Sequence, residues 1–107
     1  MKQQHQIFSS KQELEEFLPG HGLKSLTVNG VSVCIARDKN GFYAFENKCP
    51  HYSVPLDTGN LNFMGEVVCS LHAYRFSLKD GWETNGKGLC LKRYALEIHE
   101  NGVQLEM

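Results

Sequence analysis

The chain has 107 residues, and its eleven basic and twelve acidic side chains give a formal charge of −1. This length suits a single core, so we predict one domain over residues 1–107. The charges form neither a long run nor a basic stripe, which argues against a nucleic-acid partner. No apolar run approaches the roughly eighteen residues of a membrane span, and the N-terminus lacks the apolar core of a secretion signal. We therefore expect a cytoplasmic protein with no membrane partner.

The first predicted element is one short N-terminal helix. Ser10 is followed three residues later by Glu13, which is the spacing of a capping box. Apolar residues then recur at helical spacing until Pro19-Gly20 ends the pattern. This predicts a helix of about two turns.

After the helix, the pattern changes to that of strands. Apolar and β-branched runs are separated by Asn-Gly and Asp-Gly pairs, which accept the positive φ angles of tight hairpin turns. Seven short strands are predicted, at residues 24–28, 31–37, 42–46, 66–69, 75–78, 91–99 and 103–106. The expected fold is all-β, a small antiparallel β-sandwich.

Two short segments between predicted strands each hold one cysteine and one histidine. They are Cys49-Pro50-His51 and Cys69-Ser70-Leu71-His72, and seventeen residues separate them. A tetrahedral zinc finger usually has a cysteine pair followed by a histidine pair, so this mixed order is better suited to two metals side by side. If both cysteines bind one iron and both histidines bind the other, the result is a 2Fe-2S cluster. The alternative, two buried Cys-His pairs in a β core, is disfavoured because the segments have the Pro and Gly punctuation of loops.

The ligand pattern resembles that of the Rieske family. The resemblance extends to Pro55-Leu56 after the first pair, and to Arg75-Phe76 and Asp80-Gly81 after the second, where soluble Rieske ferredoxins have a strand and a turn. It spans nearly the whole chain and implies one Rieske 2Fe-2S cluster, held by a cluster-binding subdomain at approximately residues 47–80. The ligands that it implies are Cys49, His51, Cys69 and His72.

The resemblance implies an electron-transfer protein rather than an enzyme. Such a carrier passes single electrons from a flavoprotein reductase to a terminal oxygenase or similar enzyme. The alternative is a small electron-transfer subunit of a larger oxidoreductase, similar to the small subunits of nitrite reductases. A third possibility, a redox sensor or a structural zinc module, is disfavoured by the mixed ligand order.

Four loop residues imply a low reduction potential. Rieske proteins of respiratory complexes have an extra cysteine in each loop, and Ser and Tyr hydroxyls two and four residues after the second histidine. This chain has Val54 and Leu71 at the cysteine positions, and Tyr74 and Phe76 at the hydroxyl positions. The loop disulfide therefore cannot form and at least one hydroxyl donor is absent, which implies the low end of the family's range, near about −150 mV.

The loops also depart from the pattern of soluble Rieske ferredoxins. Ser53 and Ala73 stand where these relatives usually have glycine, so each costs roughly 1 kcal/mol if its position needs a positive φ. The segment at residues 85–89 lacks the proline that often covers the cluster in relatives, so we expect greater mobility there.

Apolar residues beside the predicted ligands are open to two interpretations. Pro50, Tyr52, Val54 and Leu71 either form an apolar collar for a transient redox interface or seal the cluster from water.

The remaining unusual residues are predicted to have structural roles. Cys34 and Cys90 lie within apolar runs, so we expect small buried hydrophobes and no disulfide between them. Trp82 is expected to pack in the core or a turn. The histidines without a cysteine or histidine at ligand spacing, expected at the surface or hydrogen-bonded, are His5, His21 and His99.

Overall fold

The computed structural model describes residues 2–71, 73–84 and 88–107. Its elements are β1 (Gln4–Phe8), α1 (Lys11–Phe17), β2 (Gly22–Val28), β3 (Val31–Asp38), β4 (Gly41–Glu46), the 3-10 helix η1 (Leu56–Thr58), β5 (Asn60–Leu61), β6 (Glu66–Val68), β7 (Arg75–Ser77), β8 (Arg93–His99) and β9 (Gly102–Glu106). All seven predicted strands are present, and β1 and β5 are additional.

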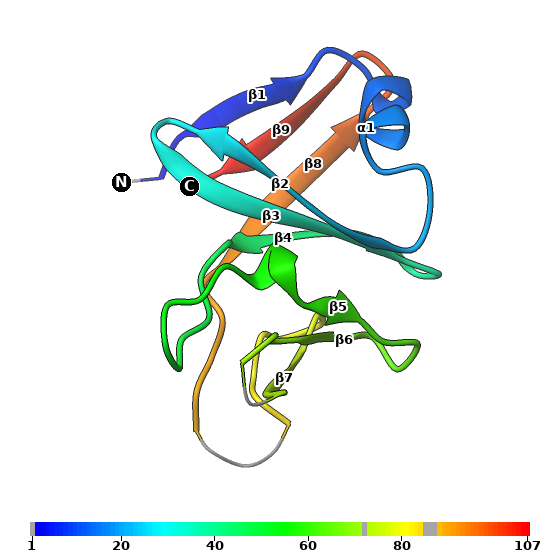
Figure 1. The fold of residues 1–107 in the computed structure, drawn as a ribbon. Coiled ribbons are helices and arrows are strands. Elements are labelled where there is room, and N and C mark those ends of the chain that lie inside the picture. The colour runs from blue at the N-terminus through cyan, green and yellow to red at the C-terminus, as the bar shows by residue number, and fades with distance from the viewer. Residues whose placement is uncertain (1, 72, 85–87) are drawn as a thin grey trace.

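The strands form two antiparallel sheets. The larger has the order β1-β9-β8-β4-β3-β2, and the smaller has the order β5-β6-β7. Strand β8 connects the two halves of the larger sheet, because its first two residues pair with β4 and the remainder pairs with β9. Figure 1 shows the larger sheet curled on itself, with the small sheet below β4. The prediction of a small antiparallel β-sandwich with one short helix is confirmed.

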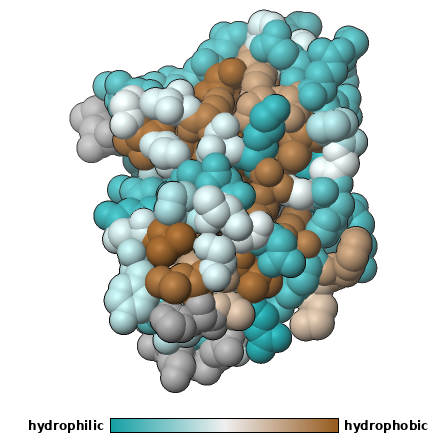
Figure 2. Space-filling model, viewed as in Figure 1, coloured by the Kyte–Doolittle hydropathy of each residue, from teal (hydrophilic) through white to brown (hydrophobic). Residues whose placement is uncertain are grey.

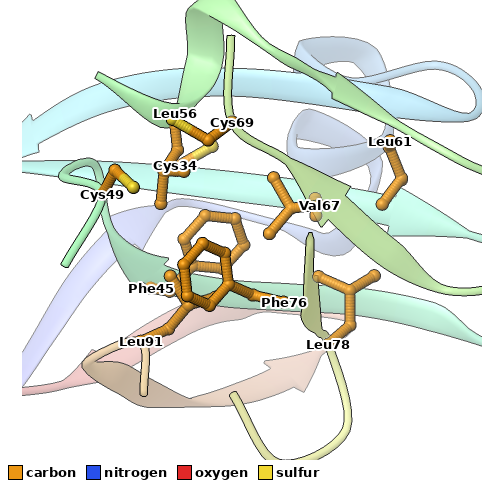
Figure 3. Close-up of a cluster of buried hydrophobic side chains, with 11 residues drawn as sticks. Cys34, Phe45, Cys49, Leu56, Leu61, Val67, Cys69, Phe76, Leu78 and Leu91 are labelled. Carbon is orange, nitrogen blue, oxygen red and sulfur yellow. The ribbon is translucent and has the colours of Figure 1, made fainter. Parts of the chain in front are cut away.

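Strand β3 separates two hydrophobic cores, because successive side chains of a strand point to opposite faces. Val33 and Ile35 belong to the core inside the curled sheet, which also receives Leu14 from the helix. Cys34 and Ala36 belong to the second core, between the curled sheet and the small sheet. Figure 3 shows this second core, with cysteine side chains gathered at one side of it. The predicted ligand loops therefore rest on the larger sheet through a shared apolar layer.

Ser10 caps the helix as predicted, but the second bond of the predicted capping box is made to Ser9 rather than to Ser10. The hydroxyl oxygen of Ser10 accepts a hydrogen bond from the backbone N–H of Glu13 at 3.1 Å. The carboxylate of Glu13 turns to Ser9, accepting hydrogen bonds from its backbone N–H at 3.0 Å and its hydroxyl at 2.8 Å. These two bonds to Ser9 lower the pKa of Glu13. The helix packs through Leu14, which is fully buried.

The predicted burial of the two remaining cysteines is correct for Cys34 and wrong for Cys90. Cys34 is buried as expected, and this burial, with a smaller contribution from Asp57, raises its pKa to about 12. Cys90, however, is exposed, because it alternates with Leu89 and Leu91, which face the core.

Trp82 is likewise 54% exposed, since its neighbours Gly81 and Glu83 take the inward positions. It pairs across a single β-bridge with Cys90, and its backbone N–H donates to the Asp80 carboxylate at 2.9 Å. Of the two environments predicted for Trp82, core or turn, the structure therefore shows the turn.

The predictions of no disulfide between Cys34 and Cys90, and of surface or hydrogen-bonded histidines, agree with the structure. Cys34 and Cys90 are free cysteines. His5 is half-buried, while His21 and His99 are exposed, and Nε2 of His21 lies 3.2 Å from the carbonyl oxygen of Asn62. No helix in the described part of the chain is long and apolar enough to cross a membrane.

Candidate metal centre

The two cysteine-containing loops are closed by the same backbone hydrogen bond. In the loop that follows β4, the N–H of Cys49 donates to the carbonyl of Val54 at 2.8 Å. In the loop between β6 and β7, the N–H of Cys69 donates to the carbonyl of Tyr74, also at 2.8 Å. Each bond joins the cysteine to the fifth residue after it, so the two loops are closed in the same way. The sequence does not reveal this, because the predicted histidine is two residues after Cys49 but three after Cys69.

The shared geometry includes a left-handed residue at the same place in each loop. Ser53 has φ 61° and Ala73 has φ 53°, and each is the fourth residue after its loop cysteine. Both positions therefore have a positive φ, so the condition under which strain was expected at Ser53 and Ala73 is met. Residues with a Cβ are strained in this region, by about 1–2 kcal/mol each. The loops keep this left-handed conformation because the closing hydrogen bonds and the packing beneath the loops fix the backbone.

The two loops bring Cys49 and Cys69 together. Both side chains are buried in the same core, and Cys49 is near enough to Cys69 to affect the ionisation of its thiol. Burial is the largest cause of a raised pKa for the Cys69 thiol, and the adjacent Cys49 raises it further. The backbone N–H of Leu71 donates to the Cys69 sulfur at 3.4 Å and acts in the opposite direction. A metal would favour the thiolate form at both cysteines, since a coordinating thiol is deprotonated.

His51 faces the second loop as well as its own. The residue is half-buried, and its Nδ1 atom is fully buried. Its ring stacks on that of Tyr74, with a centroid distance of 3.9 Å and an interplanar angle of 21°. The ring of Tyr52 lies 4.1 Å away and is tilted by 59°. Tyr74 thus links the two loops through its side chain, a contact for which the sequence offers no signal.

The fourth predicted ligand, His72, lies outside the described residues. Within the part of the chain that is described, no three or more potential ligands are grouped so that they could hold one metal ion. A Rieske cluster does not require such a group, because each iron takes two protein ligands and two bridging sulfides. The structure therefore places three of the predicted ligands, Cys49, His51 and Cys69, on adjoining loops.

A hydrogen bond and a close backbone approach join the bases of the loops. The hydroxyl oxygens of Thr58 and Ser70 are 3.0 Å apart, and Ser70 directly follows a predicted ligand. A Cβ atom built on Gly59 would overlap the carbonyl oxygen of Val68. Glycine is therefore required where the chain leaving the first loop crosses the chain entering the second.

The base of the first loop is also attached to the larger sheet. The Asn47 side-chain oxygen accepts a hydrogen bond from the N–H of Asp57 at 2.9 Å. The Asn47 amide nitrogen donates a hydrogen bond to the Ser32 hydroxyl at 3.1 Å. The Asp57 carboxylate in turn accepts a hydrogen bond from Ser25 at 2.6 Å. Together these bonds connect the two ends of the loop with β2 and β3.

The apolar residues beside the loops divide into two groups. Tyr52 is 60% exposed and Leu71 is 36% exposed, whereas Val54 packs against the core beneath the loops. Figure 2 shows hydrophobic residues exposed at the lower left, at the end of the molecule that carries the loops. The other exposed apolar pair, Phe63 and Met64, lies on the β5–β6 turn.

The described residues fit an iron–sulfur cluster in their chemistry. Two adjacent buried thiols suit a ferric ion, an imidazole with a buried nitrogen suits a second metal, and an N–H directed at a cysteine sulfur stabilises a thiolate. The profile of the Rieske 2Fe-2S domain matches residues 7–94 of the chain.

The chain belongs to the Rieske 2Fe-2S domain family.

Its cofactor is therefore a Rieske 2Fe-2S cluster. A similar protein is the ferredoxin component of the alkene monooxygenase system of Xanthobacter autotrophicus, 32% identical over 66 residues. The match covers 62% of this chain and 54% of that ferredoxin, so the chain spans about half the length of this relative.

Solved structures share the Rieske fold over nearly the whole chain. The ferredoxin of carbazole 1,9a-dioxygenase from Nocardioides aromaticivorans superposes with a TM-score of 0.78 at 24% identity, covering 95% of each chain. A structure described as a putative nitrite reductase NADPH small subunit has a TM-score of 0.76 at 20% identity, covering 96% of this chain and 97% of the other. At these identities the likeness concerns the fold alone.

Proposed function

We propose that the protein is a one-electron carrier that takes electrons from a reductase and passes them to a terminal oxygenase or similar enzyme. We assign Cys49 and Cys69 to one iron, and His51 and His72 to the other. The observation that carries the proposal is the pair of buried, adjacent cysteines on two loops of matching geometry. The ferredoxin component of the alkene monooxygenase system supports the same role.

When bound, a Rieske cluster supplies a one-electron couple within roughly −150 to +300 mV. The chain holds its thiolates in the core, directs the Leu71 N–H at one sulfur, and fixes the His51 ring against Tyr74. Phe76 is fully buried and presents no hydroxyl to the site. The missing hydroxyl at Phe76, together with Val54 and Leu71 in place of loop cysteines, favours the low end of the range.

The proposed arrangement is a single domain over residues 1–107, with a cluster-binding subdomain at residues 47–80. The small sheet and both loops fall within this range, which supports the boundary. The proposed location is the cytoplasm, and the free state of Cys34 and Cys90 supports a reducing compartment. The proposed partners are a flavoprotein reductase and an oxygenase or other redox enzyme, with neither nucleic acid nor membrane involved.

Metal analysis and spectroscopy test the proposal directly. Anaerobically purified protein should contain two irons and two acid-labile sulfides per chain and give a Rieske-type paramagnetic resonance signal after dithionite reduction. Colourless protein that stays iron-free after cluster reconstitution would refute the carrier role. Zinc without sulfide would indicate a structural zinc module instead.

Reconstitution with partners then separates the carrier from the second candidate, a small subunit of a larger oxidoreductase. The nitrite reductase small subunit with a similar fold is the observation that favours this candidate. A free carrier should restore turnover when added to a separate reductase and terminal oxygenase. Stable co-purification with a large catalytic subunit would instead support the subunit role.

A further inference from the structure

Tyr74 contacts both cluster loops through different groups. Its carbonyl oxygen accepts the N–H of Cys69 and so closes the second loop. Its ring lies almost parallel to that of His51, in the first loop, at a centroid distance of 3.9 Å. Because the Tyr74 backbone is held by the loop closure, its ring is a fixed surface for the imidazole.

The face of an aromatic ring carries negative charge, so it attracts a positively polarised group placed over it. An imidazole bound to iron gives electron density to the metal, and it gives more to ferric than to ferrous iron. A ring face stacked on this imidazole therefore stabilises the oxidised cluster more than the reduced one. The consequence is a lower reduction potential.

We propose that Tyr74 is a positioning residue that fixes the plane of the His51 imidazole and, through its ring face, lowers the potential of the cluster. This inference rests on the proposed cluster function, with His51 as an iron ligand. The effect belongs to the aromatic ring and not to the hydroxyl. Tyr52 differs because its ring is tilted by 59° to the imidazole and is largely exposed to water.

The first test compares the midpoint potentials of two variants by anaerobic redox titration. Tyr74→Phe keeps the ring and should leave the potential unchanged. Tyr74→Leu removes the ring face and should raise the midpoint potential. The expected change is a shift of the one-electron equilibrium towards the reduced form by about threefold to tenfold, where tenfold corresponds to 59 mV. The matched control is Phe63→Leu, the same type of change on the exposed β5–β6 turn, which should have no effect.

A second test preserves the packing, so it remains decisive if Tyr74→Leu does not retain the cluster. The ring introduced by Tyr74→Phe is replaced by phenylalanine analogues with increasing numbers of fluorine atoms, which weaken the negative ring face while keeping nearly the same shape. The potential should rise stepwise with the fluorine count. A flat series would overturn the proposal, as would a shift in Tyr74→Phe as large as that in Tyr74→Leu.

Failure of this inference is distinguishable from failure of the proposed function. If the carrier function is wrong, the unaltered protein lacks iron, sulfide and the reduced-state signal. If only the role of Tyr74 is wrong, the unaltered protein carries a normal cluster, and its potential does not respond to the ring at position 74.

Discussion

At the residue scale, Ser53 and Ala73 adopt backbone conformations that favour glycine. A left-handed conformation costs a residue with a Cβ about 1–2 kcal/mol, and substitution by glycine removes this strain. The greater freedom of glycine in the unfolded chain cancels about 0.4–1 kcal/mol of the stability that is gained. Ser53→Gly and Ala73→Gly should therefore each stabilise the protein by about 0.5–1 kcal/mol. The measurement is the urea concentration at which the visible absorbance of the anaerobic protein is half lost. Lys48→Gly, at an exposed position of the first loop without positive φ, should lower this midpoint.

The exposed and buried members of the apolar collar have different expected roles. Tyr52 is exposed beside a predicted ligand, so Tyr52→Lys should slow reduction by a redox partner about tenfold while leaving the cluster spectrum unchanged. Val54 packs on the core, so Val54→Lys should impair cluster retention. Phe63→Lys, on the β5–β6 turn, is the surface control and should retain the normal rate. A disturbed spectrum in Tyr52→Lys would show that this side chain seals the cluster instead.

The sequence predicts individual residues well where one local pattern decides their environment. The interleaved cysteines and histidines identify the site, and the capping box identifies Ser10 as the helix cap. The same reasoning misplaces Cys90, because an apolar run does not reveal which of its members faces the core. The contact between Tyr74 and His51 depends on two loops meeting in space, and no sequence spacing encodes it.

At the scale of elements, β1 and β5 were not predicted because tertiary pairing creates them. β1 is a largely polar segment that becomes a strand by pairing with β9 at the edge of the larger sheet. β5 has only two residues and pairs with β6 where the chain crosses at Gly59. β5 is too short to be identified from sequence, and β1 lacks the alternation of apolar and polar residues that identifies a strand.

The crossing at Gly59 leads to a prediction for the small sheet. A methyl group at this position would overlap the carbonyl oxygen of Val68, so Gly59→Ala should move the backbone and cost about 3 kcal/mol. We expect cluster content per chain to fall sharply, as measured by iron and sulfide analysis. Gly20→Ala is the matched control, because no atom lies within 4 Å of the added Cβ, and it should load the cluster normally. Normal cluster content in Gly59→Ala would contradict the close approach.

At the scale of the whole molecule, the two cores differ in their dependence on the cluster. The core inside the curled sheet is built from aliphatic and aromatic residues, including Leu14, Ile35 and Leu105. The core under the loops includes both predicted cysteine ligands, Cys49 and Cys69. Without the cluster, these two buried thiols lose the metal that joins the loops, whereas the other core keeps all its contacts.

Removal of the cluster should therefore loosen one part of the protein selectively. Hydrogen exchange of the cluster-free protein, followed by mass spectrometry, should become more than about tenfold faster in peptides from residues 47–71 and 73–80. Peptides from β1, β8 and β9 should retain their protection, since these strands pair with one another away from the loops. Strands β3 and β4 contribute to both cores and should show an intermediate response. Equal loss of protection in every strand would show that the chain unfolds as one unit, and would remove the distinction between the cluster-binding subdomain and the rest of the domain.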